Sequence, residues 1–177
     1  MSLLKTNKIV SPDGRTLLNS TGSVIQVKSS VKTDRDSYTL NNSDWNTISN
    51  LSLTITPNST ANKILVLLDF ACGTEGSHNR CEWALFRGSN QIYQGDASSS
   101  AGRATGKFAY SEDQTVQYRE TCVYLDNPST NSSIEYSLRI RDGNADGGSI
   151  YINQSRVGNA SNGTMSASSI ILMEVCG

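Results

Sequence analysis

The sequence is poor in the residues that most often serve in catalysis, membrane insertion or nucleic-acid binding. It contains one histidine and three prolines in 177 residues, and aromatic residues make up 7%. No apolar run approaches the roughly 18 residues of a membrane span. The 15 Lys and Arg residues are scattered and the net charge is −1, whereas phosphate binding needs concentrated positive charge. We therefore expect neither a membrane nor a nucleic acid as a partner.

The first residues also lack the apolar core of a secretory signal peptide, so we expect assembly in the cytoplasm. The chain is instead rich in Ser, Thr and Asn, which together make up about a third of it. Short uncharged polar residues suit turns and the solvent side of strands. A length of 177 residues fits one domain that buries roughly 68–70% of its unfolded surface.

Apolar residues alternate with polar ones in many short segments, which predicts β-strands and no helix. Residues 63–71 are nearly continuously apolar, which favours a strand buried on both faces. Residues 95–106 are small and polar and predict a long surface loop. The segments predicted as strands are 23–33, 45–56, 63–71, 81–87, 91–93, 115–125, 134–141, 150–153 and 168–175. This spacing predicts an all-β antiparallel jelly-roll sandwich.

A different pattern precedes Gly22, so we expect a short extended N-terminal arm at 1–21 and a jelly-roll domain at 22–177. An arm of this length cannot bury enough surface to offset its ordering entropy. Its larger apolar residues should therefore dock on a neighbouring chain, and a disordered tail is the alternative. These anchoring residues are Leu3, Leu4, Ile9, Val10, Leu17 and Leu18.

Several segments, spread over almost the whole chain, resemble virion structural proteins of tailed bacteriophages, cyanophages in particular. The sequence is similar to that family in the segments 4–9, Asp13-Gly14, 22–27, 55–66, 85–88, 125–130 and 169–175. The resemblance implies a jelly-roll body related in outline to the C1q and tumour-necrosis-factor heads. It also implies a homotrimer located in the virion, on a tail fibre or on the capsid surface.

The resemblance also implies that the chain binds another virion protein, either the major capsid protein or a tail or baseplate protein. The chain has no fibre shaft, which raises the prospect of a compact capsid decoration or cement protein over a short tail fibre. Edge strands and apolar faces give an independent reason to expect self-association. Five aromatic residues are candidates for that surface, with core packing as the alternative: Trp45, Tyr118, Tyr124, Tyr136 and Tyr151.

The four cysteines are Cys72, Cys81, Cys122 and Cys176, and we expect buried free thiols. Cys72, His78 and Cys81, with Cys122 as a fourth ligand, are a weak metal candidate because paired ligand turns are absent. A disulfide between Cys72 and Cys81 is a further alternative. We expect no metal and no cofactor.

Catalytic motifs are equally scarce, so we expect no enzyme. His78 has no nucleophile motif beside it. Glu112 with Asp113, or Asp142 with Asp146, are candidate acid pairs for a polysaccharide depolymerase, but they lie in polar or Gly-rich turns where acidic residues are expected anyway. The segment 142–148 resembles a calcium-loop fragment but lacks the distal glutamate. A receptor- or carbohydrate-binding head is the alternative function, with a host surface glycan bound near loop 95–106 by Tyr93 and Tyr110.

Overall fold

The computed structural model describes residues 8–10, 12, 16–19, 21–40, 43–75, 81–108, 111, 113–143, 147–157 and 161–177, with the backbone alone described at 8–10 and 16–19. Within these ranges the chain forms β-strands and no helix, so no described helix is long and apolar enough to span a membrane. The strands are β1 (Lys8–Val10), β2 (Thr16–Asn19), β3 (Val24–Lys32), β4 (Asp36–Leu40), β5 (Asn46–Ile55), β6 (Lys63–Thr74), β7 (Cys81–Arg87), β8 (Asn90–Ile92), β9 (Gly106–Lys107), β10 (Tyr118–Asp126), β11 (Ile134–Asp142), β12 (Gly148–Ile152) and β13 (Ser168–Val175).

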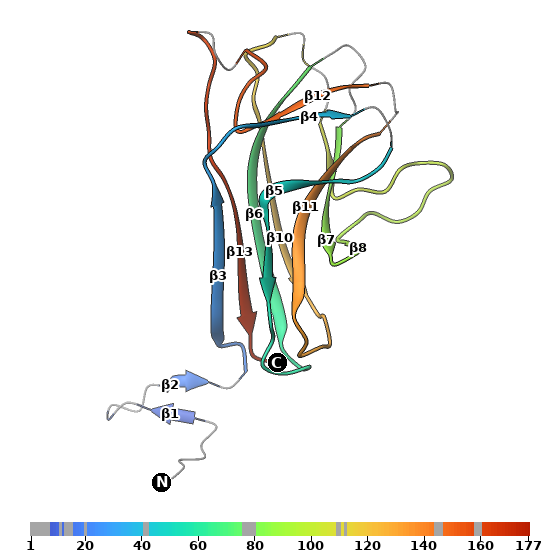
Figure 1. Ribbon diagram of the computed structural model, residues 1–177. Coiled ribbons are helices and arrows are strands. Elements are labelled where there is room, and N and C mark those ends of the chain that lie inside the picture. Colours follow the sequence, from blue (N-terminus) through green and yellow to red (C-terminus); the bar gives the residue numbers. More distant parts are fainter. Residues whose placement is uncertain are drawn as a thin grey trace.

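Eight of these strands form two antiparallel sheets that pack face to face (Figure 1). One sheet has the order β3, β13, β6, β10, and the other has the order β5, β11, β7, β8. Counted along the chain, these orders are 1-8-3-6 and 2-7-4-5, which is the arrangement of a jelly roll. Strand β12 pairs with the C-terminal end of β6, past the part of β6 that pairs with β13; β4 pairs with β12, and β9 pairs with β7. The predicted all-β antiparallel sandwich is confirmed.

The core lies between the two sheets and is built from alternate residues of each strand. From β6 it receives Ile64, Val66, Leu68 and Phe70, each no more than 2% exposed. The Phe70 ring packs edge-on against Trp83 of the opposite sheet, with ring centroids 5.2 Å apart. Burying such side chains contributes roughly 1.5–3 kcal/mol each.

The observed strands match the predicted segments closely where apolar and polar residues alternate regularly. The predicted segment 168–175 is β13, and residues 95–105 form a loop without a strand, as expected. In β5 the core side changes from Ile48 to Leu51 across Asn50, which has a positive φ of 60°. The register of β5 against β11 shifts at this point, so one strand contributes two apolar runs of opposite phase.

The expectation that β6 is buried on both faces is wrong. Its outward residues Leu65, Leu67 and Asp69 are only partly buried. The second sheet covers one side of β6. On the other side residues 154–156 pack over Gly73, but Leu65, Leu67 and Asp69 stay partly exposed. Two further strands of the sandwich, β4 and the short β9, were not predicted; β9 begins at Gly106, the last residue of the predicted loop 95–106.

The arm is also more ordered in its backbone than an extended segment. Strands β1 and β2 pair with each other as an antiparallel hairpin, with Ile9 opposite Leu18 and Val10 opposite Thr16. Figure 1 shows this hairpin beyond the end of the sandwich at which the C-terminus lies. The division into an arm at 1–21 and a domain at 22–177 stays a prediction.

Candidate functional site

The outward side of the sheet β3-β13-β6-β10 is largely aliphatic. Antiparallel pairing places residues from all four strands in rows across it, and directly paired residues point to the same side. The first row is Val27, Met173, Leu65, Leu125; the second is Ser29, Ile171, Leu67, Val123; the third is Val31, Ser169, Asp69, Thr121. We call these three rows the outer apolar face.

Its edges are strongly exposed to solvent. Val27 and Val31 on β3 are 57% and 61% exposed, and Val123 and Leu125 on β10 are 64% and 47% exposed. Asp69 is the one charged residue of the three rows, and it forms an ion pair with Arg119 at their end. Soluble monomers rarely expose a contiguous apolar surface of this kind without a binding role.

Strand β3 has its polarity reversed relative to an ordinary surface strand. The residues on its core side are Gln26, Lys28, Ser30 and Lys32, because they pair with the core-facing positions of β13. Its valines face outward instead. A strand at the rim of the sandwich can place polar side chains inward without loss, but exposing Val27 and Val31 gains nothing in an isolated chain. This orientation leaves Val27 and Val31 exposed in the single chain.

The outward side of the other sheet, on β5, β11 and β7, is polar; we call it the polar face. Its one large buried aromatic, Phe86, lies under the guanidinium of Arg139, 4.2 Å from the ring centroid. Arg141 lies 4.5 Å from the Trp45 ring and forms a 2.7 Å ion pair with Glu82. Thus this face covers its own aromatic side chains with charged groups.

The junction between hairpin and body is fixed by backbone hydrogen bonds. Gly22 N–H donates to the Cys176 carbonyl, and Cys176 N–H donates to the Ser23 carbonyl, both at 2.9 Å. Gly22 has φ +79°, a conformation that favours glycine. These bonds continue the β3–β13 ladder to the last residues before the arm.

The predicted anchoring residues are not tested by this arrangement. Leu3 and Leu4 lie outside the described residues. Ile9 and Val10 lie on β1, and Leu17 and Leu18 on β2, with the backbone alone described. Their docking on a neighbour stays a prediction.

None of the five candidate aromatics lies in the rows of the outer apolar face. Tyr136 is fully buried, and its hydroxyl donates a 2.6 Å hydrogen bond to Asp126. Tyr118 and Tyr124 pack against the core, and Trp45 contacts Phe86. Tyr151 donates to Glu75. The surface is aliphatic, and the signal that could have found it was the excess of apolar residues in 63–71.

The cysteines are free thiols in the structure. Cys72, Cys81 and Cys122 are buried, as expected, whereas Cys176 is partly exposed. Burial raises the pKa of Cys72 and of Cys81 well above the usual range, so neither is a ready metal ligand or nucleophile. His78 lies outside the described residues, and the described part contains no cluster of three potential ligands.

The acid pairs considered for depolymerase chemistry are each incomplete in the described part, since Glu112 and Asp146 lie outside it. Asp113 accepts hydrogen bonds from the Thr115 amide and hydroxyl, an ordinary turn contact. Asp142 is buried and accepts from the Gly147 amide. For the glycan alternative, Tyr93 is 48% exposed and its ring lies 4.8 Å from that of Tyr124, while Tyr110 lies outside the described residues.

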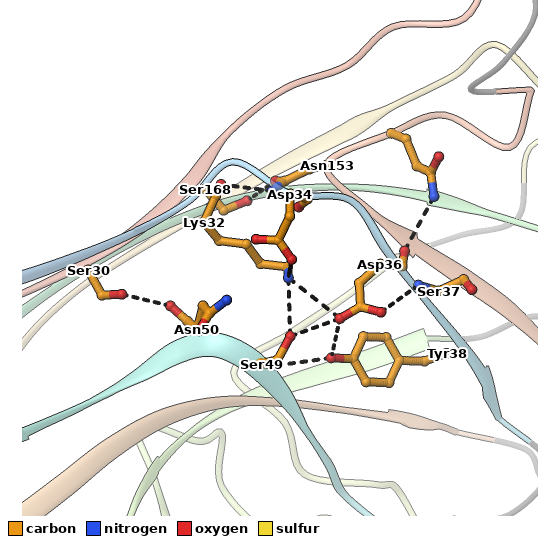
Figure 2. Close-up of polar contacts among 11 residues, drawn as sticks. Ser30, Lys32, Asp34, Asp36, Ser37, Tyr38, Ser49, Asn50, Asn153 and Ser168 are labelled. Carbon is orange, nitrogen blue, oxygen red and sulfur yellow. Dashed lines mark hydrogen bonds and ion pairs between the residues drawn. The ribbon is translucent and has the colours of Figure 1, made fainter.

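The most extensive polar cluster surrounds Lys32, whose side chain is fully buried where the chain leaves β3 for β4 (Figure 2). Lys32 Nζ lies 2.6 Å from Asp34 Oδ2 and 3.5 Å from Asp36 Oδ2. Burial alone would lower the pKa of Lys32, but the two carboxylates outweigh it and raise that pKa. Asp36 accepts hydrogen bonds from Ser49 and Tyr38 as well.

This Lys32 cluster serves the fold. It joins the end of β3 to β4 and β5, and Asn153 extends it by donating to the Lys32 and Asp34 carbonyls. The Lys32 ammonium group directs its hydrogen bonds to Asp34, Asp36 and Ser49, so it has no donor left for a substrate. The outer apolar face is therefore the leading candidate functional site.

The fold thus defines an all-β jelly-roll sandwich whose distinctive surface is an uncovered aliphatic sheet. No protein-family model matches the chain, and no curated protein matches it. Among solved structures, infectious bursal disease virus of the Gt and Gx strains matches with TM-scores of 0.45 and 0.44 at 9% and 10% identity. The VP2 subviral particle of infectious bursal disease virus matches with a TM-score of 0.43 at 11% identity.

These matches cover 99%, 98% and 100% of this chain but 42% of each viral chain. The chain therefore spans less than half the length of the viral chains it is similar to. The likeness concerns the fold alone.

Proposed function

We propose that this chain is a non-enzymatic structural protein of a virus particle. It forms a homotrimer through its outer apolar face and is held on the particle by its N-terminal arm. The outer apolar face is the observation that carries the proposal, because a partner packed on it would remove Val27, Val31, Val123 and Leu125 from water. The sequence resembles virion proteins of tailed bacteriophages. The proposed particle is therefore a bacteriophage, on which the chain is a capsid decoration or cement protein or a short tail fibre.

The face can form the centre of a contact with a second copy of the chain. Strands lie about 4.8 Å apart and each residue adds about 3.3 Å, so the three rows, which span five residues of each of four strands, cover roughly 300 Å² in projection. A specific interface buries about 800 Å² of accessible surface per partner. Side chains stand above the sheet, so their accessible area exceeds the projection, but a full interface would also include residues beside the three rows.

A second apolar patch favours a ring over a face-to-face dimer. Identical patches that meet each other close a twofold dimer, whereas a threefold ring brings two different patches together. Tyr93 and Tyr124 provide the second patch at the β10 side of the sandwich, next to Leu125 of the face. The side of one copy with these tyrosines would pack on the outer apolar face of the next copy.

The arm would provide the particle contact, with the major capsid protein or a tail or baseplate protein as its partner. Removing residues 1–21 should leave a folded trimer. When this truncated protein is added to particles that were assembled without the chain, it should no longer bind to them. Light scattering would report the mass and circular dichroism the fold, so that loss of incorporation is not confused with unfolding. Incorporation of the truncated protein at the wild-type level would refute the anchoring role.

A receptor- or glycan-binding head is the second candidate, favoured by the exposed Tyr93 at the start of the loop 95–105. Tyr93 has a positive φ of 49°, which non-glycine residues adopt rarely and mostly where the surroundings hold them. A glycan array probed with the wild-type chain and with Tyr93→Ala would separate the two functions. Binding that disappears in the variant, with the trimer intact, would favour the head; loss of the trimer would place Tyr93 in the subunit contact.

A further inference from the structure

The hairpin is tethered closely to one end of the outer apolar face. Strand β2 ends at Asn19, and Gly22 is already fixed to Cys176 by its amide. Three residue steps separate these two points, which allows a reach of about 10 Å. The first residues beyond the tether, Val24 and Ile25, are 50% and 41% exposed and lead directly into Val27 of the face.

The base from which the hairpin leaves is rigid because a buried carboxylate organises it. Glu174 is fully buried and accepts hydrogen bonds from the Asn58 amide at 2.6 Å and the Asn62 side chain at 2.6 Å. The last residue, Gly177, donates its amide to Asn62, and a Cβ there would lie 2.0 Å from the Ala61 carbonyl oxygen. The turn at 57–62, the C-terminus and the arm junction therefore form one fixed end.

We propose that self-association gathers the arms of all copies at one end of the assembly, so that the protein binds its particle through several arms at once. The inference rests on the proposed trimer. In a ring with one rotation axis, the equivalent ends of all copies lie at the same end of that axis. The short tether and the fixed base then keep each arm beside the self-association surface and close to its equivalents.

The partner implied by this arrangement is a protein assembly that presents several equivalent docking sites with matching rotational symmetry. A single arm of about twenty residues offers few contacts. Linking several arms raises the effective concentration of each further arm to the millimolar range and strengthens binding by roughly 10²–10⁴-fold. A monomeric partner with one site would gain nothing from the second and third arms.

The gathering of the arms can be measured without the particle. The full chain would carry Cys176→Ser, which removes the one partly exposed thiol, and Thr60→Cys, which places a spin label on the exposed turn beside the arm junction. We expect one distance between copies, well below the roughly 40 Å length of the twelve-residue strand β6. Distances above that length would mean that copies associate in opposite directions, and would overturn the inference while leaving self-association in place.

The number of arms needed can be measured with mixed assemblies. Full-length wild-type chain and a full-length arm variant, Ile9→Asp with Leu18→Asp, would be co-expressed at several ratios and added to particles assembled without the chain. Assemblies with one wild-type arm should require roughly 10²–10⁴-fold more protein for half-saturation than those with three. Equal binding by one and three arms would overturn the inference alone, binding by the pure arm variant would overturn the anchoring role, and a monomeric wild-type chain would overturn both.

Discussion

The two sheets of this sandwich present opposite surfaces to their surroundings. The outer apolar face exposes valines and leucines, whereas the polar face covers Phe86 and Trp45 with the guanidinium groups of Arg139 and Arg141. Both sheets bury their inner sides in the same core, so the fold does not require their outer sides to differ in polarity. One face shields its aromatic side chains within the chain, and the other leaves its aliphatic side chains exposed to solvent.

The largest effect is expected from a charge placed in the middle of the outer apolar face. Leu67→Asp should weaken self-association about a thousandfold, or about 4 kcal/mol, because an unpaired carboxylate would be buried at the subunit contact. Leu67 is partly exposed in the single chain, so the folded body should survive. Sedimentation velocity over a range of concentrations would measure the change.

A matched control lies on the polar face. Thr47→Asp places the same charge at an exposed position of β5, opposite Arg139 of β11. It should leave the assembly unchanged. Equal weakening by both substitutions would show that the effect is general and that the two faces do not differ in function.

The polar face should respond in the opposite way, with a loss of folding stability and no loss of association. Arg141→Leu removes the partner of Glu82, whose side chain is 10% exposed, and should lower the free energy of unfolding by about 3 kcal/mol. Urea unfolding at fixed protein concentration would measure this. Arg141→Lys should retain part of the stability, and a change in assembly mass for either variant would contradict the division of roles.

Sequence reasoning could find the fold because alternation is a local property. In the segment 168–175 apolar and polar positions alternate regularly, and this segment is β13. Turn residues mark where each predicted strand begins and ends. Alternation does not say which side of a strand faces the core. In β3, Val27 and Val31 have the opposite parity to Lys28 and Lys32, and only the pairing with β13 decides that the valines face outward and that Lys32 is on the core side. Alternation alone therefore could not place Val27 and Val31 on the outer apolar face, although the excess of apolar residues in 63–71 was a signal for the face itself.

The Lys32 cluster escaped prediction for a related reason, since its partners come from three strands. A fully buried lysine is improbable from sequence, because burial penalises its charge. Asp34 and Asp36 follow on the same segment, but Ser49 joins from β5 and Asn153 from the end of β12. Only the folded chain brings these groups together.

The Lys32 cluster should make folding stability depend on acidic pH. Hydrogen bonds from Ser49 and Tyr38 and the charge of Lys32 lower the pKa of Asp36 below 3.8, although burial works in the other direction. A lowered carboxyl pKa gives stability that is present above pH 3.8 and is lost as the pH falls through the folded-state value. Asp36→Asn should therefore be less stable at pH 7 and should lose less stability than the wild type between pH 4 and pH 2. Thermal unfolding across this range would test it, and parallel pH profiles would contradict the role of Asp36.

The smallest effect concerns the ion pair at the end of the outer apolar face. Asp69 and Arg119 are 34% and 52% exposed, so Arg119→Gln should change the free energy of unfolding by less than about 1 kcal/mol. Its effect on self-association is the more informative quantity. An interface limited to the first two rows of the face would leave the pair in solvent, and association would then be insensitive both to the substitution and to salt. A tenfold or larger change would mean that the subunit contact includes the third row, with Val31 and Asp69, and buries the pair, where a lost partner leaves Asp69 uncompensated.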